Sequence, residues 1–207
     1  MALIAAKPIL SACVLTVLLL ACSSDAAKDE KSKGRTEEGA LPVTRWDFRS
    51  ESDVWTAAAL AAMKKDGQKV LAMDLRDGNT WCPAYNNADQ DQRAEFWVGL
   101  LSALAKHEST WNPNASGGGG RWLGLTQIAP MSANFYGCGL SRSELFVGEK
   151  NLACAVKIME ARVPSGGVVT STGSPWKGMS RDWAPFRKSA KRAEMAGWTS
   201  KQAYCVK

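Results

Sequence analysis

One long amphipathic segment constrains the fold of this 207-residue chain more than any other feature. The stretch from about Asp89 to Ser109, DQDQRAEFWVGLLSALAKHES, has the apolar spacing of a helix. Asn112-Pro113 stops it, because the residue before a proline is pushed out of the helical region. At about 100° per residue, Glu108 falls on the same face as Trp97 and Leu101. The segment therefore predicts a central helix that carries an acid on its apolar side.

Shorter helical segments surround this one along the chain. Ser52 or Asp53 caps a helix that ends at Gly67, MSANFY after Pro130 forms a short helix, Asn151 caps a helix that Pro164 closes, and FRKSAKRAEMAGW forms a last helix that Gly197 stops. The stretch VLAMDLRDGNT suits either a short helix or a strand, and RWLGLTQIAP suits a tight hairpin or loop. Together these patterns predict an all-α domain with a small irregular or β wing.

Residues 1–21 are typical of an export signal, because an apolar run from Ile9 to Leu20 is too short for a comfortable membrane span. The run ends in Leu19-Leu20-Ala21-Cys22, which resembles the lipobox of bacterial lipoproteins, where the cysteine is acylated after cleavage. Ordinary cleavage near Ser24, which discards Cys22, is the alternative. Acylation at Cys22 predicts a periplasmic protein held on a membrane by its acyl chains, and Ser23 favours the outer membrane.

Residues 22–50 predict a disordered tether behind the lipidated cysteine. From Ser23 to Arg49 the chain is rich in Lys, Asp, Glu, Ser and Gly and has almost no large apolar side chain before Trp46. Such a segment cannot offset its ordering entropy by burial. Residues 51–207 then form one folded domain, which is long enough to bury its own core.

The net charge of +6, or +5 once Lys7 leaves with the signal, favours an anionic partner. For an exported protein, the bacterial cell wall is the expected one. We find no nucleic-acid-binding motif, and the basic run from Arg187 to Arg192 is typical of a solvated helix face, so nucleic acid is not expected as a partner. We expect the protein to be a monomer.

Four cysteines, Cys82, Cys138, Cys154 and Cys205, remain after Cys13 and Cys22 are set aside. An even number in an oxidising compartment indicates two disulfides, although four cysteines permit three pairings. We favour Cys138–Cys154 and Cys82–Cys205, the second of which ties the start of the folded domain to its end. A metal site is not expected, because the chain has one histidine and no Cys-x-x-Cys spacing, and we expect no cofactor.

The position of Glu108 has a chemical consequence. Partial burial among Trp and Leu side chains and the negative end of the helix dipole both favour the protonated carboxyl, which a general acid needs. The alternative is a frayed last turn in which Glu108 reaches water or pairs with Arg121 or Lys106. The glycines from Gly117 to Gly120 leave room for a large ligand, and Gln127 offers an amide suited to sugar hydroxyls.

The sequence ESTWNPNAS…GRWLGLTQIAP resembles the motif of soluble lytic transglycosylases, which belong to the lysozyme-like superfamily together with goose-type lysozyme. The resemblance covers roughly Phe96 to Val163 and implies a lysozyme-like fold. It also implies that Glu108 is the catalytic acid, that Ser109 is its motif partner and that Gln127 lines the cleft. Thr126 stands where the family usually has methionine.

The downstream Tyr-Asn-Ala-Gly motif of the family is missing. The stretch SRDWAPFR occupies about that place, so Trp183 or Phe186 could line the cleft, although aromatic residues there are as readily explained by core packing. Tyr136 is another candidate for the missing hydroxyl.

The number of acids near Glu108 bears on the reaction. Two-carboxylate glycosidases need a second acid, and none stands out in the motif region. Asp182 and Glu149 are more typical of capping or surface residues. In lytic transglycosylases one glutamate protonates the leaving oxygen and then acts as base on the C6 hydroxyl of N-acetylmuramic acid, which closes a 1,6-anhydro ring. This mechanism predicts cleavage of the MurNAc–GlcNAc β-1,4 bond in peptidoglycan. A goose-type hydrolase and a catalytically silent peptidoglycan-binding lipoprotein are the alternatives.

Overall fold

Residues 39–206 are described by a computed structural model of the chain. The predicted signal peptide, residues 1–21, and the predicted acylation site, Cys22, lie outside these residues. Within the described part, none of the helices combines the length and the apolar character that crossing a membrane requires.

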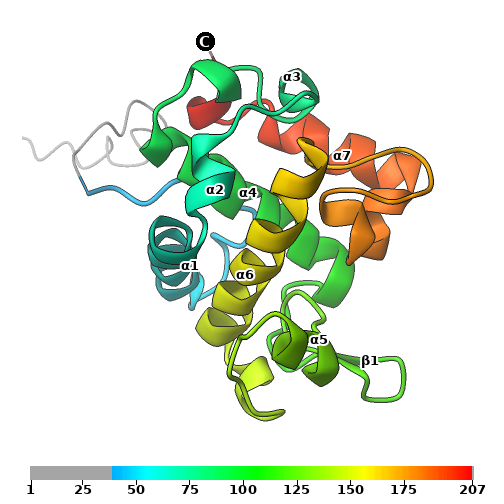
Figure 1. The fold of residues 1–207 in the computed structure, drawn as a ribbon. Coiled ribbons are helices and arrows are strands. Elements are labelled where there is room, and N and C mark those ends of the chain that lie inside the picture. The colour runs from blue at the N-terminus through cyan, green and yellow to red at the C-terminus, as the bar shows by residue number, and fades with distance from the viewer. Residues whose placement is uncertain (1–38, 207) are drawn as a thin grey trace, which may run out of the picture. The chain divides into compact units, whose positions relative to one another are not determined.

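The described part is mostly helical, with one small antiparallel sheet (Figure 1). Its α-helices are α1 (Ser52–Asp66), α2 (Gln68–Ala72), α3 (Gly78–Trp81), α4 (Gln90–Ser109), α5 (Pro130–Phe135), α6 (Gly148–Gly166) and α7 (Ser189–Thr199), and its strands are β1 (Ser116–Gly117) and β2 (Trp122–Leu123). Short 3₁₀ helices span Tyr85–Asn87, Glu144–Phe146, Met179–Arg181, Ala184–Arg187 and Ala203–Cys205. The predicted all-α architecture with a small wing is confirmed, and the ambiguous stretch before residue 81 forms two short helices.

Helix α4 is the central element: α1 and α7 both pack on it, and α6 packs on α1 (Figure 1). A capping box starts α4, in which the Asp89 side chain accepts a hydrogen bond of 2.8 Å from the backbone N–H of Gln92. Thr110 ends the helix in the left-handed conformation with a φ of 51°. The helix predicted from about Asp89 to Ser109 is therefore confirmed, but its end is set by Thr110 before the chain reaches the proline.

Aromatic side chains pack the start of α4 against α2 and the segment before α4. The ring of Tyr85 lies 5.2 Å from that of Phe96 and 6.1 Å from that of Trp97. The Tyr85 hydroxyl accepts a hydrogen bond of 2.9 Å from the Trp97 indole and donates one of 2.8 Å to the Val70 carbonyl. This buried chain of hydrogen bonds satisfies the polar atoms of both rings inside the apolar core.

The wing is a hairpin between α4 and α5, in which Ser116 pairs with Leu123 and Gly117 with Trp122. Its glycines were expected to leave room for a ligand, and this is wrong for two of them. A Cβ atom at Gly118 would lie 2.1 Å from the Trp122 ring, and one at Gly117 would lie 2.5 Å from the side-chain oxygen of Gln127. The side chains of Trp122 and Gln127 therefore occupy the space at these two glycines. Gly120 faces the end of the Arg142 side chain, and of the four only Gly119 is open on the side where a Cβ would lie.

Asn151 does not cap α6, as the sequence predicted, because α6 begins at Gly148 and Asn151 is fully buried within its first turns. Its side-chain oxygen accepts hydrogen bonds from the backbone N–H and the hydroxyl of Thr126, at 2.9 and 2.7 Å. Its amide donates to the carbonyls of Leu123 and Leu145, at 3.0 and 2.9 Å. One buried amide thus joins α6 to the segment that follows the hairpin.

Three other helix ends differ from the prediction. Helix α1 starts after Glu51 without a side-chain cap, α6 continues through Pro164 to Gly166, and Gly197 lies inside α7. Gly167, with a φ of 63°, supplies the left-handed residue that ends α6. Pro164 was given too much weight as a stop. Pro164 lies in the last turn of α6, where the loss of one hydrogen bond affects only the end of the helix.

The predicted tether extends too far toward the C-terminus. Residues 39–50 belong to the folded body, because Trp46 is fully buried and its indole donates a hydrogen bond of 2.8 Å to the Thr56 hydroxyl of α1. The Tyr204 hydroxyl donates to the carbonyl of Val43 at 3.2 Å. The composition of this segment concealed its order, since a single tryptophan anchors it in the core.

Two disulfides join the pairs that the sequence analysis favoured, Cys82–Cys205 and Cys138–Cys154. The first spans 123 positions and links the end of α3 to the last 3₁₀ helix. The second links the segment after α5 to α6.

Candidate active site

Glu108 lies in the last turn of α4, half-buried at the end of the apolar face predicted from the sequence. Trp97, Leu101 and Leu104, which share that face, are fully buried. Burial raises the pKa of Glu108 from 4.5 to about 7, although the charge of Lys191 on α7 acts in the opposite direction. A substantial fraction of this carboxyl therefore still carries its proton near neutral pH, where an ordinary glutamate is almost fully ionised.

The alternative of a frayed, ion-paired Glu108 is not observed. Arg121 lies over the Trp122 ring at 5.0 Å and donates to the Gly118 carbonyl, and Lys106 binds Glu194 at 2.8 Å. Within residues 39–206, the Glu108 carboxyl makes no hydrogen bond or ion pair. Its proton is thus available to a ligand.

Ser109, the predicted partner of Glu108, turns back along the helix, and its hydroxyl donates a hydrogen bond of 3.1 Å to the Ala105 carbonyl. This is a local helix contact. A role of Ser109 in ligand binding stays a prediction.

Gln127 ties the turn after the hairpin to the turn that follows Glu108. It has a positive φ of 51°, which is costly for a residue with a side chain. Its amide donates to the carbonyls of Ala115 and Gly124, at 3.1 and 2.9 Å, and these bonds hold the strained conformation. Both hydrogen bonds from the Gln127 amide nitrogen are therefore made within the protein. Gln127 stabilises the loop and also lines the adjacent pocket.

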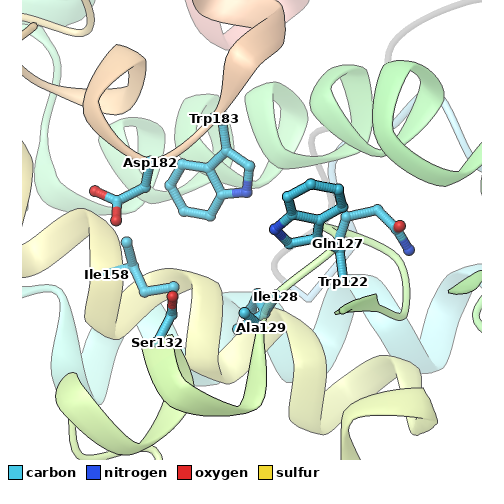
Figure 2. Close-up of a pocket in the computed structure, with 8 residues that line it drawn as sticks. All are labelled: Trp122, Gln127, Ile128, Ala129, Ser132, Ile158, Asp182 and Trp183. Atoms are coloured by element: carbon cyan, nitrogen blue, oxygen red, sulfur yellow. The ribbon is translucent and has the colours of Figure 1, made fainter. Parts of the chain in front are cut away.

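A pocket of about 290 Å³ lies between the hairpin, α5, α6 and the segment before α7 (Figure 2). It is lined by Trp122, Gln127, Ile128, Ala129, Ser132, Ile158, Asp182 and Trp183. Ser132 and Asp182 also line a second, more open hollow of about 490 Å³ beside α5. The two hollows therefore share part of their walls. Glu108 lines neither of them.

Trp183 has both of the roles that the sequence left open. It is 3% exposed, and its indole donates a hydrogen bond of 2.9 Å to the Thr126 carbonyl, so it packs in the core and supports the loop that carries Gln127. Figure 2 shows its ring at the pocket wall between Asp182 and Gln127. Phe186 is fully buried against Trp81 and lines neither hollow.

Tyr136 lines the second hollow, where its hydroxyl donates a hydrogen bond of 2.7 Å to Asp182. The other oxygen of Asp182 accepts one of 2.9 Å from Arg162, whose guanidinium also lies 5.0 Å from the centre of the Tyr136 ring. Burial, followed by the neighbouring Asp182 carboxylate, raises the pKa of Tyr136 to about 12. Tyr136, Asp182 and Arg162 therefore contact one another, and the proton of the Tyr136 hydroxyl is used in the hydrogen bond to Asp182.

Sequence reasoning missed three features of this region. Lys191 faces Glu108 from α7, Trp122 stands 44% exposed at the pocket, and Asp182 lies in both hollows. Their positions depend on contacts between distant segments, so no local pattern could have found them. In the described ranges, no three His, Cys, Asp or Glu side chains are grouped as a metal site requires.

Proteins of solved structure share this fold, which is consistent with a lysozyme-like all-α domain. Among solved structures, the protein Bd0314 DslA matches in its wild-type form with a TM-score of 0.72 and 25% identity over 80% of this chain and 98% of that one. A glutamate-to-glutamine variant of DslA matches with a TM-score of 0.74 and 26% identity, over the same shares of the two chains. None of the curated proteins matches this chain.

Residues 85–174 match the family model of the transglycosylase SLT domain. The matched range includes α4, the hairpin, α5 and α6, and therefore Glu108 and Gln127. The family comprises lytic transglycosylases, whose substrate is peptidoglycan.

Proposed function

We propose that this protein is a lytic transglycosylase that cleaves the MurNAc–GlcNAc β-1,4 bond of peptidoglycan, with Glu108 as acid and then as base. The observation that carries the proposal is the half-buried Glu108 carboxyl, whose pKa burial raises to about 7 and which no described side chain neutralises. A group with a pKa near the ambient pH can both give and take a proton within one catalytic cycle.

In the first step, the Glu108 carboxyl donates its proton to the bridging oxygen as the bond from that oxygen to C1 of MurNAc breaks. The carboxylate then takes the proton of the MurNAc C6 hydroxyl, whose oxygen bonds to C1. The proton returns to Glu108, no water is consumed, and the products are a free 4-hydroxyl and a 1,6-anhydro sugar. This cycle needs a single carboxylate.

A two-carboxylate hydrolysis is less well supported, because it requires a second free acid. Asp182 is the carboxylate that lines the pocket, but its two oxygens accept hydrogen bonds from Tyr136 and Arg162. Glu149, the other acid considered, lies in the first turn of α6. A hydrolase would therefore need Asp182 to leave both partners.

The test is product analysis of purified peptidoglycan sacculi digested by the protein. We expect mass spectrometry to show anhydromuropeptides, each one water molecule lighter than the corresponding reducing muropeptide. Glu108→Gln should abolish them, whereas Glu149→Gln, the same chemical change on another helix, should leave the yield unchanged. Reducing products alone would identify a hydrolase, and no products from the folded wild type, with binding unaffected by Glu108→Gln, would identify a silent binding protein.

We also propose that the mature protein is a periplasmic lipoprotein, anchored through Cys22, with the outer membrane as the expected site. This proposal is supported by the lipobox-like sequence that ends at Cys22. Labelled palmitate should be incorporated into the wild type and not into Cys22→Ala. Membrane fractionation of the wild type should then place it with the outer membrane, and equal recovery of both variants in the soluble fraction would contradict anchoring.

A further inference from the structure

Three basic side chains, Lys106, His107 and Arg45, meet one carboxylate beside the last turn of α4. Glu194 of α7 binds Lys106 through Oε1 and His107 through Oε2, each at 2.8 Å. Nη1 of Arg45, from the segment before α1, lies 2.5 Å from Oε1 of the same carboxylate. Lys106 and His107 directly precede Glu108, so this cluster holds the turn that carries the proposed acid.

Arg45 is itself held in place by other contacts. Its backbone N–H donates a hydrogen bond of 2.9 Å to the Ser102 hydroxyl of α4, and its guanidinium lies 5.5 Å from the centre of the Trp198 ring. The side chain is 14% exposed. Glu194 therefore joins three segments, α4, α7 and residues 39–50, at one point.

Positively charged side chains outnumber carboxylates around Glu194. Burial by itself raises the pKa of Glu194, but contacts from Lys106, Arg45 and His107 outweigh burial and lower its pKa to about 2. Glu194 is therefore ionised at every relevant pH. Its one negative charge faces two permanent cations and a histidine, while Lys191, one turn earlier on α7, faces Glu108.

We propose that Glu194 is a positioning residue for the reaction proposed above: it holds the last turn of α4 against α7 and balances the positive charge beside Glu108. This inference rests on the proposed role of Glu108 as the acid. A proton on Glu108 is favoured when the surrounding charge is low or negative and disfavoured when cations are left unpaired. Glu194 thus acts on the acid through its neighbours without touching the sugar.

The charged groups that bear on this argument come from every element at the site. Lys106 and His107 come from α4, Lys191 from α7 and Arg45 from residues 39–50. Removing the charge of Glu194 leaves the positive charges of Lys106, Lys191 and Arg45 in place, so we expect the pKa of Glu108 to fall. For two charges on the order of 10 Å apart near a protein surface, Coulomb's law gives a shift of about half a pKa unit to one unit.

The experiment measures the titration of the Glu108 carboxyl by ¹³C NMR, with the resonance assigned by its loss in Glu108→Gln. Glu194→Gln should lower the pKa of Glu108 by about half a unit to one unit. The double variant Glu194→Gln/Lys106→Gln removes one charge of each sign, and we expect it to restore at least half of that fall. If Glu194 had only a structural role, the double variant would not restore the pKa of Glu108, because the contact between residues 106 and 194 would still be missing.

Asp91→Asn is the matched control on the same helix. It breaks the exposed pair between Lys64 and Asp91, 2.7 Å apart, near the first turn of α4, and it should leave the titration of Glu108 unchanged. If Glu194→Gln does not fold, as judged by circular dichroism, Lys106→Gln alone provides the test. It keeps Glu194 and removes a cation, so it should raise the pKa of Glu108.

Activity provides the second readout. The alkaline limb of kcat/KM for peptidoglycan should move to lower pH in Glu194→Gln, with a loss of about 3- to 10-fold at pH 8 and a smaller loss at pH 5. An unchanged titration of Glu108 in Glu194→Gln, or in Lys106→Gln where the first does not fold, would overturn the inference. If the wild type cleaves nothing, the proposed function fails, but the titration still decides whether Glu194 controls the protonation of Glu108.

Discussion

Replacing Glu108 by glutamine should make the protein more stable at alkaline pH. The folded state raises the pKa of Glu108 from 4.5 to about 7, so ionisation of this group is easier in the unfolded chain than in the folded one. Below pH 4.5 the carboxyl is protonated in both the folded and the unfolded protein, so it has little effect on the free energy of unfolding. As the pH rises from 4.5 to 7, the unfolded chain gains the free energy of ionisation while the folded protein does not, and stability is lost.

The magnitude follows from the same two values. Each pKa unit corresponds to about 1.4 kcal/mol, so the difference between 4.5 and about 7 gives about 3 kcal/mol of lost stability above pH 8. Glutamine has the same shape and cannot ionise, so Glu108→Gln avoids this loss. The free energies of unfolding of the two proteins should be similar at pH 4.5 and should differ by about 2–3 kcal/mol at pH 8.5, with the variant more stable.

The assay is urea unfolding of the disulfide-intact protein, followed by tryptophan fluorescence at a series of pH values. The difference between variant and wild type should grow between pH 4.5 and 7 and stay constant above that range. A difference that does not change with pH would refute the reasoning, because it would show that the folded protein does not disfavour the charged form of Glu108. Glu149→Gln is the control, and its difference from the wild type should show no such growth.

Three further perturbations test the fold around the site. Gly124→Ala should destabilise the protein by about 3 kcal/mol or more in urea unfolding, because Gly124 has a φ of 76° and a Cβ there would lie 2.1 Å from the Leu145 carbonyl. Asn151→Asp should cost at least about 3 kcal/mol, measured as a lower midpoint of thermal unfolding at pH 7, because a buried carboxylate would face two carbonyl oxygens in place of the amide. Replacing Cys82 and Cys205 by serine should lower the free energy of unfolding by about 5 kcal/mol in the chain-entropy model, and a loss below about 1 kcal/mol would contradict that model.

The elements that the sequence predicted well are those with strong local signals. Helix α4 combines a capping box at Asp89 with a regular apolar face, and both are visible in a window of about twenty residues. Helix α6 was less well predicted because its local signals were misleading. Asn151 was interpreted as a cap and Pro164 as a stop, although the first is a buried bridge to the hairpin and the second lies inside the last turn.

The segment before α1 shows that composition can also mislead. Residues 39–50 follow a strongly charged stretch and were assigned to a tether together with it, yet Trp46 is buried against α1 and Arg45 reaches Glu194 in α7. A composition average does not show that one or two side chains have partners far away in the chain. Those partners decide whether the segment is ordered.

For the site, the sequence by itself determined that an acid would stand on the apolar face at the end of a long helix, because helical periodicity places Glu108 in line with Trp97 and Leu101. Only the tertiary structure decided how that acid is surrounded. Its cation, Lys191, and the carboxylate that holds its neighbours, Glu194, come from a helix more than eighty positions away. The pKa of a carboxyl depends on burial and on every nearby charge, so the pKa of Glu108 depends on how α4 packs against α7, which helical periodicity does not show.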